Sequence, residues 1–398
     1  MKVLFAHDHV FLRDELGHYY SYGQFPYEVW QRYLSAFDSV VVASRVRNMR
    51  DGAWKEKLNL ASGPNVSFVA IQDIRILTKM LYRRAQVARI LKNELTCVSA
   101  LIARLPSEIG TLAIQLAERL GKPWAVEITG CAWDVLWHYG RITGKFYAPF
   151  DLLRTKILVR RAPFALYVTK EFLQGRYPCR GRTANCSNVM IPETNSQVLT
   201  RRQAAIEAGR LPLRIGLIGS LNAKYKGIET ALQALKKARG YLPPYEFRIL
   251  GDGDARPWQK LTGKIGLSGK TVFCGTLPSG PAVEQWLDQT DIYIQPSFAE
   301  GLPRALIEAM GRGCPALGST AGGIPELLSR DCLHRPGDSD RLAQLLTQAA
   351  NKKWQLEQAR LNFQAARQYT RPVLDQVRQD FWQEFAGAVK SNGIQMNP

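Results

Sequence analysis

Residues 298–328 read FAEGLPRALIEAMGRGCPALGSTAGGIPELL, and seven residues separate the two glutamates of this stretch, Glu300 and Glu308. The heptapeptide before it, DIYIQPS, is typical of a buried strand, so FAEG is expected to be the loop that follows. We expect a helix to begin near Leu302, because Pro303 is well tolerated in a first turn that needs no N–H. The pattern predicts a strand, a loop with Glu300, and a helix with Glu308 about two turns in.

This arrangement suits a phosphorylated sugar. The first N–H groups of a helix are unpaired and its dipole is positive there, so a diphosphate is expected beside Gly301, Leu302 and Pro303. Glu300, just before the helix, can accept hydrogen bonds from sugar hydroxyls, and Glu308 can reach the vicinal hydroxyls of a ribose. Two solvated helix charges are the alternative interpretation of this glutamate pair.

Apolar runs alternate with helical patterns along the whole chain. In the first half the expected strands are KVLFA, SVVVAS, VSFVAI, WAVEIT and FALYVT, and in the second half LRIGLIGS, YEFRILG, KTVFCG, DIYIQPS and CPALGS. Most are separated by enough residues for a crossover helix. Such alternation predicts parallel sheets with helices on both faces, an α/β architecture.

The 398 residues exceed what one hydrophobic core usually serves, so two domains are expected. The polar stretch 179–203 has no sustained periodicity, which places the boundary near residue 200. We therefore predict an N-terminal domain, 1–200, a C-terminal domain, 201–372, and a final amphipathic helix, 373–398, that packs back towards the first domain. Two doubly wound domains side by side leave a cleft at the carboxyl ends of their strands.

The composition describes a soluble protein with an acidic partner. The formal net charge is +19, which favours nucleic acid, an anionic membrane or a phosphorylated substrate. The seven cysteines are scattered without metal-ligand spacing, as in a reducing cytosol. The first apolar run is too short for a signal peptide, and no run reaches the length of about 20 residues that spans a bilayer.

The order of strand, EGLP, EAM, small residues, strand and AGG-PE resembles the donor-site signature of the group 1 (family 4) retaining glycosyltransferases. The resemblance is strongest in residues 213–330. It implies the GT-B fold, in which two Rossmann-like domains face each other across a cleft and the second binds a nucleotide sugar. It also implies chemistry without a metal site or a cofactor; the nucleotide sugar is a co-substrate, with a UDP-sugar favoured and a GDP-sugar possible.

Residues 213–235, LRIGLIGSLNAKYKGIETALQAL, look like the family's first donor-domain strand with its glycine turn, here at Gly219. Lys226 falls where a family lysine contacts the donor diphosphate, and a mobile ammonium suits phosphate as a point charge. Many relatives have an arginine six residues earlier, where this chain has Ser220. Lys224 or Arg304 is then the alternative source of a second cation.

Two further turns match the family. RILGDGD places Gly251 after the next strand, and VFCGTLPSG resembles the loop whose backbone touches the nucleotide base, near Gly275 and Leu277. The D-x-D spacing of Asp252 and Asp254 could hold a metal elsewhere. Here a tight turn explains it sufficiently, so no metal site is predicted.

In the first half, WAVEITGCAWDVLWHYGRITGKFYAP resembles a subgroup associated with capsular and O-antigen polysaccharides. Glu127 is expected to end a strand and Asp134 to open a helix, where carboxylates could orient an acceptor hydroxyl or accept its proton. Asp134 as a helix N-cap is the alternative. Asp8 and His9 are expected in a loop after the first strand, and the chain has isolated glycines, Gly17 and Gly23, where many relatives have a pair.

Two basic segments stand out, residues 75–92 and 152–162, RILTKMLYRRAQVARILK and LLRTKILVRRA. Basic amphipathic helices are typical of membrane-surface elements, and several cations together can hold a protein reversibly at an anionic leaflet. A solvated helix face is the alternative. No nucleic-acid recognition motif accompanies the charge, so nucleic acid is not expected as a partner.

The sequence therefore predicts a cytoplasmic glycosyltransferase, bound peripherally to the inner face of the cell membrane. It would move a sugar with retention from a nucleotide sugar to a lipid-linked or oligosaccharide acceptor of a cell-surface polysaccharide. Glu300, Lys226, Asp134 and Glu127 are the candidate catalytic residues. The alternatives are a non-catalytic nucleotide-sugar-binding protein and a sugar epimerase or phosphorylase on the same fold.

Overall fold

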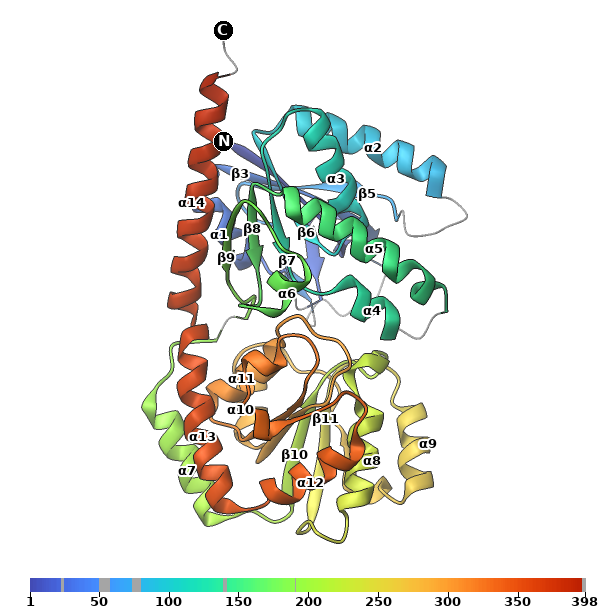
Figure 1. Cartoon of the computed structure of the whole chain (residues 1–398), viewed down its shortest axis with the longest axis vertical. Helices are drawn as coiled ribbons and strands as arrows, with labels where there is room; N and C mark the ends of the chain where they lie inside the picture. Colours follow the sequence, from blue (N-terminus) through green and yellow to red (C-terminus); the bar gives the residue numbers. More distant parts are fainter. Residues whose placement is uncertain (23–24, 50–57, 74–79, 139–141, 190, 396–398) are drawn as a thin grey trace.

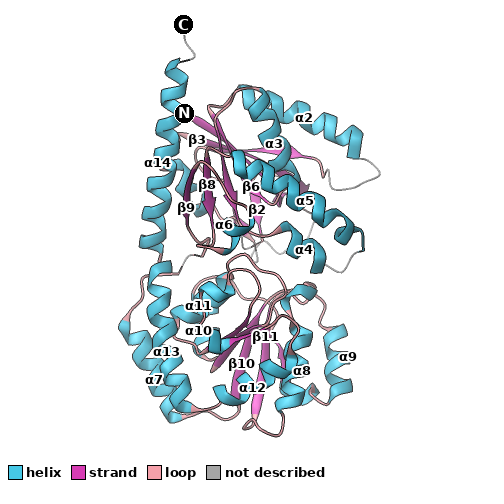
Figure 2. Ribbon diagram, in the orientation of Figure 1, coloured by secondary structure: helices cyan, strands magenta, loops and turns pink. Residues whose placement is uncertain are grey.

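The chain folds into two α/β units, one above the other in Figure 1. The computed structural model describes residues 1–22, 25–49, 58–73, 80–138, 142–189 and 191–395. Gly23 and residues 75–79 of the first basic segment lie outside these ranges. Figure 2 shows that each unit has a central sheet between layers of helices, which confirms the predicted fold class.

The sheet of the first unit is parallel except for two short strands. In its described part, β6, β7, β8 and β9 follow β1 on one side, β3 and β5 follow it on the other, and β2 and β4 add antiparallel pairing at the far end of β1. The strands are β1 Lys2–Arg13, β2 Tyr19–Ser21, β3 Ser39–Asn48, β4 Asn59–Leu60, β5 Val66–Ile71, β6 Ala100–Leu105, β7 Trp124–Ile128, β8 Phe164–Tyr167 and β9 Arg182–Asn185. The helices of this unit are α1 Glu28–Leu34, α2 Met80–Thr96, α3 Glu108–Arg119, α4 Ala132–His138, α5 Ile142–Arg161 and α6 Phe172–Arg176.

The sheet of the second unit is parallel, in the order β12-β11-β10-β13-β14-β15. Its strands are β10 Leu213–Ile218, β11 Tyr245–Leu250, β12 Thr271–Phe273, β13 Ile292–Gln295, β14 Ala316–Ser319 and β15 Leu333–His334. Its helices are α7 Ser196–Ala208, α8 Ile228–Ala238, α9 Arg256–Ile265, α10 Pro281–Asp288, α11 Arg304–Gly311, α12 Ser339–Ala349 and α13 Lys352–Ala366. All ten predicted strands are present, but the central strand β6 and the short strands β2, β4, β9 and β15 were not predicted.

The first strand is longer than predicted. β1 continues to Arg13 past a bulge between Ala6 and Val10, because its second half pairs with β3 and β2. Asp8 and His9 therefore lie in a strand and not in a loop, which corrects the prediction. The Asp8 carboxylate accepts a hydrogen bond from the N–H of Glu108, at 2.7 Å, so it stabilises the start of α3.

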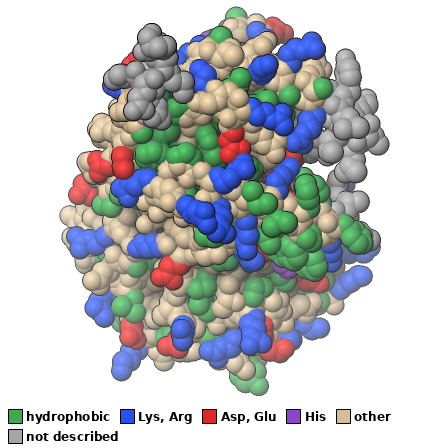
Figure 3. Space-filling view, turned by 45° about the horizontal axis from the view of Figure 1, so that its top comes forward, with side chains coloured by type: hydrophobic (Ala, Val, Ile, Leu, Met, Phe, Trp, Pro, Cys, Tyr) green, Lys and Arg blue, Asp and Glu red, His purple; other side chains and the backbone are tan. Residues whose placement is uncertain are grey.

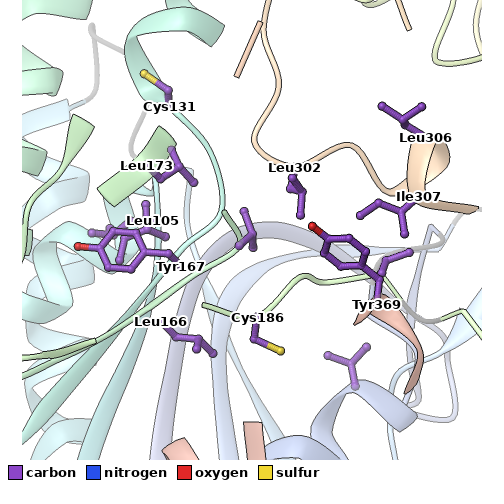
Figure 4. Packing of buried hydrophobic residues seen from close by; sticks show 14 of the residues in the cluster. Leu105, Cys131, Leu166, Tyr167, Leu173, Cys186, Leu302, Leu306, Ile307 and Tyr369 are labelled. Atoms are coloured by element: carbon purple, nitrogen blue, oxygen red, sulfur yellow. The ribbon is translucent and has the colours of Figure 1, made fainter. Parts of the chain in front are cut away.

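The last helix, α14 Arg371–Gln395, runs from the second unit along the first (Figure 1). Its aromatic residues pack on the first unit, with Trp382 at 5.5 Å from Tyr33 and Phe381 at 5.8 Å from Phe164 between ring centroids. The buried apolar side chains form one cluster with members from both units, several of which Figure 4 shows. Burial of this kind joins the two units by apolar contact.

The segment between the two sheets, from Cys186 to Pro212, contains α7. Arg202 of α7 is buried and donates hydrogen bonds to the carbonyls of Leu287 and Thr290, so this helix packs with the second unit. The exact division of the chain near residue 200 remains our proposal. In the described ranges no helix combines the length and the apolar character needed to cross a membrane.

Candidate active site

Three glycine turns meet at the carboxyl edge of the second sheet. The N–H of Gly219, after β10, donates to the carbonyl of Leu250, and the N–H of Gly251, after β11, donates to the carbonyl of Gly275, at 2.9 and 2.7 Å. A Cβ on Gly251 would lie 2.0 Å from the Gly219 carbonyl oxygen, so only glycine fits. The predicted turns at Gly219, Gly251 and Gly275 thus lie together.

Lys226 and Glu300 meet at this edge. Lys226 ends a 3-10 turn, η3 Lys224–Lys226, and its Nζ donates to Glu300 Oε1 at 2.7 Å. Gly227 follows with φ +72°, and a Cβ there would lie 1.9 Å from the carbonyl oxygen of Pro296. The glycine therefore allows the Lys226 turn to approach the loop that carries Glu300.

Two residues that the sequence analysis missed hold Glu300 in place. Gln295 Nε2 and Ser297 Oγ donate to Glu300 Oε1 at 2.9 and 2.8 Å. Tyr293 donates from its hydroxyl to Gln295 Oε1 at 2.7 Å, which fixes the amide. The signal was visible in DIYIQPS, where polar residues end an otherwise apolar strand.

Charge favours the ionised form of Lys226. Burial disfavours the ammonium, but the Glu300 carboxylate outweighs this and raises the pKa of Lys226 above its usual value. The side chains of Lys226 and Glu300 are 20% and 10% exposed. A cation and a carboxylate that are this shielded from water interact with a ligand more strongly than surface charges do.

Glu308 lies in a different environment from Glu300. Its side chain is half-buried on α11, and among the described residues it has no hydrogen-bond or ion-pair partner. Burial raises the pKa of its carboxyl above the usual value, although Arg304 acts in the opposite direction. The carboxyl borders a pocket of about 170 Å³ that Gly280, Val283 and residues 191–195 also line. It is available for a ligand.

The helix expected near Leu302 begins at Arg304, with Pro303 in extended conformation just before it. Leu302 and Pro303 are buried. A Cβ on Gly301 would lie 2.2 Å from the carbonyl oxygen of Thr129, so this glycine lets the first unit approach residues 296–303, the loop between β13 and α11 that we call the donor loop. Gly301 thus serves the contact between the units as well as the turn.

The position of Ser220 leaves Arg304 as the better second cation. Ser220 Oγ donates to the carbonyl of Asp252, at 3.4 Å, and to no other atom in the part of the chain that the structure describes. The exposed Arg304 lies near enough to affect the pKa of both Lys226 and Glu308. Lys224 faces another pocket, beside Trp258 and Phe298.

The loop after β14 links the donor loop to the first unit. Gly322 has φ +59°, and a Cβ there would lie 2.1 Å from the Glu300 carbonyl oxygen, whereas Gly323 has a negative φ. No role was predicted for Glu326, the last residue of AGG-PE. Its carboxylate accepts hydrogen bonds from the N–H groups of Lys170 and Phe172 of the first unit, at 2.6 and 2.8 Å.

Glu127 lies next to the last residue of β7, near the strand end that the sequence predicted, but its side chain is buried. It lies inside β7, is 3% exposed, accepts a hydrogen bond from the Tyr33 hydroxyl at 2.8 Å and lies 3.4 Å from Arg104 Nε. The Glu127 carboxylate packs into the core of the first unit. The apolar residues on either side of it in WAVEIT did not predict which face of the sheet it would occupy. The expectation that Glu127 faces an acceptor does not agree with this placement.

Asp134 lies in the first turn of α4, which begins at Ala132, and its Oδ1 is 3.6 Å from Arg176 Nη2. The helix lies close to η3 of the second unit, and the His138 ring is 5.3 Å from the Phe298 ring. Asp134 is thus on the element that faces the donor loop. Leu277, 39% exposed, lies between β12 and α10.

The comparisons with known proteins agree with this geometry. The family model "Glycosyl transferases group 1" matches residues 212–352, the segment with Lys226, Glu300 and Glu308. The Staphylococcus aureus protein CapJ is 32% identical over 355 residues, 89% of this chain and 87% of CapJ. The chain belongs to the group 1 glycosyltransferases.

Other relatives of this glycosyltransferase match shorter parts or the fold alone. The Erwinia amylovora protein AmsK, an amylovoran biosynthesis glycosyltransferase, is 33% identical over 145 residues, 34% of this chain and 35% of AmsK. The Anabaena protein HepE, solved in complex with UDP, has a TM-score of 0.61 at 18% identity and covers 98% of this chain and 100% of its own. The fold is the expected GT-B fold.

Within the described ranges, this glycosyltransferase has no group of three or more His, Cys, Asp or Glu residues placed to hold a metal ion. Asp254 is partly exposed and accepts hydrogen bonds from Arg256, which holds the pKa of Asp254 at about 2. Asp254 thus acts in a surface ion pair.

Proposed function

We propose that this enzyme transfers a sugar from a nucleotide sugar, with retention and without a metal ion, to a lipid-linked glycan of a cell-surface polysaccharide. UDP-sugars are the favoured donors, and GDP-sugars are the alternative. The observation that carries this proposal is the pairing of Lys226 with Glu300, just before a helix on which the Glu308 side chain has no partner among the described residues. The three groups match a diphosphate, a sugar and a ribose in that order.

In this proposal the leaving group is stabilised by fixed positive charge. The diphosphate lies at the start of α11, where the free N–H groups and the helix dipole favour an anion. Lys226 contributes a full positive charge and Arg304 a second. Preorganised charge of this kind lowers the barrier because it is aimed at the charge that develops as the bond to the sugar breaks.

The two glutamates are proposed to position the donor. Glu300 is held by three donors on one oxygen, so Oε2 remains for a sugar hydroxyl. Glu308 accepts from the ribose. Attack from the face of the departing phosphate, assisted by that phosphate, gives retention without an enzymic nucleophile. Asp134 on α4 is the remaining candidate for receiving the acceptor proton.

The names of the relatives support the acceptor class. AmsK is named for the biosynthesis of a polysaccharide, and HepE was solved with UDP. We propose a lipid-linked glycan because the chain is strongly basic, with a net charge of +19. An enzyme held at an anionic leaflet meets lipid-linked acceptors there. We therefore propose peripheral association with the cytoplasmic face of the membrane.

The test is a transfer assay with UDP-, GDP-, ADP- and dTDP-sugars, an undecaprenyl-diphosphate-linked sugar as acceptor, and EDTA. We expect one nucleotide to support transfer with EDTA present, and the product linkage, read by NMR coupling constants, to keep the donor configuration. An inverted linkage or an absolute need for metal would contradict the mechanism. Binding of a nucleotide sugar without transfer to any acceptor would favour the non-catalytic alternative.

A further inference from the structure

The outer face of α5 carries an unusual row of exposed apolar side chains. Phe146 is 82% exposed, Phe150 59%, Leu153 60% and Ile157 48%. Their spacing of four, three and four residues places them on one side of the helix, over about 16 Å. We call these four residues the α5 stripe.

The α5 stripe lies on a helix that is firmly packed on its other side. Ala148, Thr155, Leu158 and Val159 are buried against the first unit. The stripe is thus exposed while its helix is part of the core. Single exposed apolar residues are common, but a contiguous apolar row on a folded element usually marks an interaction surface.

Aromatic residues of α4 extend this surface. Trp137 is 39% exposed and stacks on Trp133, with ring centroids 5.0 Å apart. Figure 3 shows hydrophobic side chains gathered beside Lys and Arg over this part of the molecule, at the right of the view. Trp and Phe beside cations are the composition that favours the headgroup region of a bilayer.

The charges around the stripe have one sign. Lys145 lies 5.5 Å from the Trp137 ring, and Lys156 and Arg160 have no ion-pair partner in the part of the chain that is described. The acidic side chains nearby are neutralised, since Arg154 pairs with Asp151 and with Glu108, at 2.9 Å from Glu108 Oε2. A protein partner with an acidic apolar face is the alternative, but exposed aromatic side chains beside these cations match an anionic leaflet better.

We propose that the α5 stripe, with Trp137, Lys145, Lys156 and Arg160, docks the enzyme on an anionic lipid bilayer. The stripe enters the headgroup region and the cations remain at the phosphates. The role of this surface in acceptor access rests on the proposed function. α4 leads from the stripe to the donor loop, where His138 contacts Phe298. A lipid-linked acceptor would therefore reach the cleft from the docked side.

The proposal is tested by sedimentation with vesicles of phosphatidylcholine alone and of phosphatidylcholine mixed with phosphatidylglycerol. We expect the full chain to bind the anionic vesicles, and the variant Phe146→Ser/Phe150→Ser to lose about tenfold or more of its partitioning. The matched control is Leu211→Ser/Tyr241→Ser, which removes two residues of the second unit that are 68% and 76% exposed. The control should bind like the wild type.

A second variant, Lys156→Gln/Arg160→Gln, should weaken binding to anionic vesicles and reduce its salt dependence. Equal vesicle binding by the wild type and Phe146→Ser/Phe150→Ser would overturn the proposal, as would a wild type that ignores vesicles. A wild-type dimer that Phe146→Ser/Phe150→Ser makes monomeric would also overturn it, because the stripe would then join two copies. Nucleotide-sugar binding, measured on the same samples without lipid, should be unchanged. That readout separates failure of docking from failure of the proposed donor site.

Discussion

At the scale of single residues, Glu300 and Glu308 come from one loop and helix but have opposite surroundings. Glu300 has three donors on one oxygen, whereas Glu308 is half-buried and has no partner among the described residues. A half-buried carboxylate without a side-chain partner in the described part of the chain can accept hydrogen bonds from a ligand in the pocket that it borders.

The raised pKa of Glu308 predicts a pH dependence of donor binding. As the pH falls through this pKa, the carboxylate gains a proton and becomes a weaker acceptor for the ribose hydroxyls. Calorimetry with UDP-glucose, whose diphosphate does not titrate in this range, should show affinity falling at a higher pH than an ordinary glutamate gives. In Glu308→Gln this pH dependence should disappear, and affinity should be lower by about 1–3 kcal/mol. A variant with the wild-type pH profile would assign the effect to another group.

Lys226 and Lys224 provide a matched pair. Lys226→Met should weaken UDP-glucose binding by about 1.5–3 kcal/mol and lower kcat, because the diphosphate loses a charged hydrogen bond. Lys224 lies two residues earlier and faces another pocket. Lys224→Met should therefore change the free energy of binding and the activation free energy by less than about 0.5 kcal/mol each. Equal losses would show that the turn contributes general positive charge and not one specific contact.

At the scale of elements, the sequence predicted ten strands because continuous apolar runs with β-branched residues identify buried parallel strands. It missed β6, ALIARL, because only three residues separate this run from the end of α2 and none of them is glycine or proline. It also missed β2, β4, β9 and β15, which have two to four residues each. It also ended β1 too early, because residues 7–9 are polar and the pairing of residues 10–13 with β3 and β2 depends on distant segments. The glycine turns were predictable, because a tight turn or a close backbone approach requires glycine at that position.

Gly322 tests how the turn after β14 supports the donor loop. In Gly322→Ala the Cβ would meet the Glu300 carbonyl oxygen at 2.1 Å in addition to the strain of φ +59°. Gly121 has φ +62° with no heavy atom within 4 Å, so Gly121→Ala measures the φ strain alone. By chemical denaturation we expect a loss of about 1 kcal/mol for Gly121→Ala and at least about 1–2 kcal/mol more for Gly322→Ala. Donor affinity should fall only in Gly322→Ala; equal effects of the two variants would contradict the close contact.

At the scale of the whole molecule, α14 and Glu326 both connect the two units. α14 packs its aromatic residues on the first unit, and Glu326 binds the N–H groups of residues 170–172. The sequence identified the AGG-PE segment but not this use of it, because the partner segment is more than 150 residues away. The exposed α5 stripe was equally hidden, since an apolar row on a helix normally predicts a buried face.

Glu326 therefore predicts a link between domain contact and catalysis. Glu326→Ala removes charged hydrogen bonds between the units, so kcat should fall severalfold while nucleotide affinity, supplied by the second unit, changes little. Glu326→Asp keeps the carboxylate on a shorter side chain and should restore part of kcat. Asp331→Ala, an exposed acidic residue nearby, is the control. If Glu326→Ala retained the wild-type kcat, this contact would be irrelevant to turnover.

The most direct test of the donor site is thermal unfolding of the full chain with UDP-, GDP-, ADP- and dTDP-sugars, in the presence of EDTA. We predict that one nucleotide raises the Tm of the wild type, and that Glu308→Ala and Lys226→Met, folded without ligand, lose most of this shift. If no nucleotide sugar shifts the Tm of the folded wild type, or if both variants keep the full shift, the assignment of Lys226, Glu300 and Glu308 as a donor site is wrong.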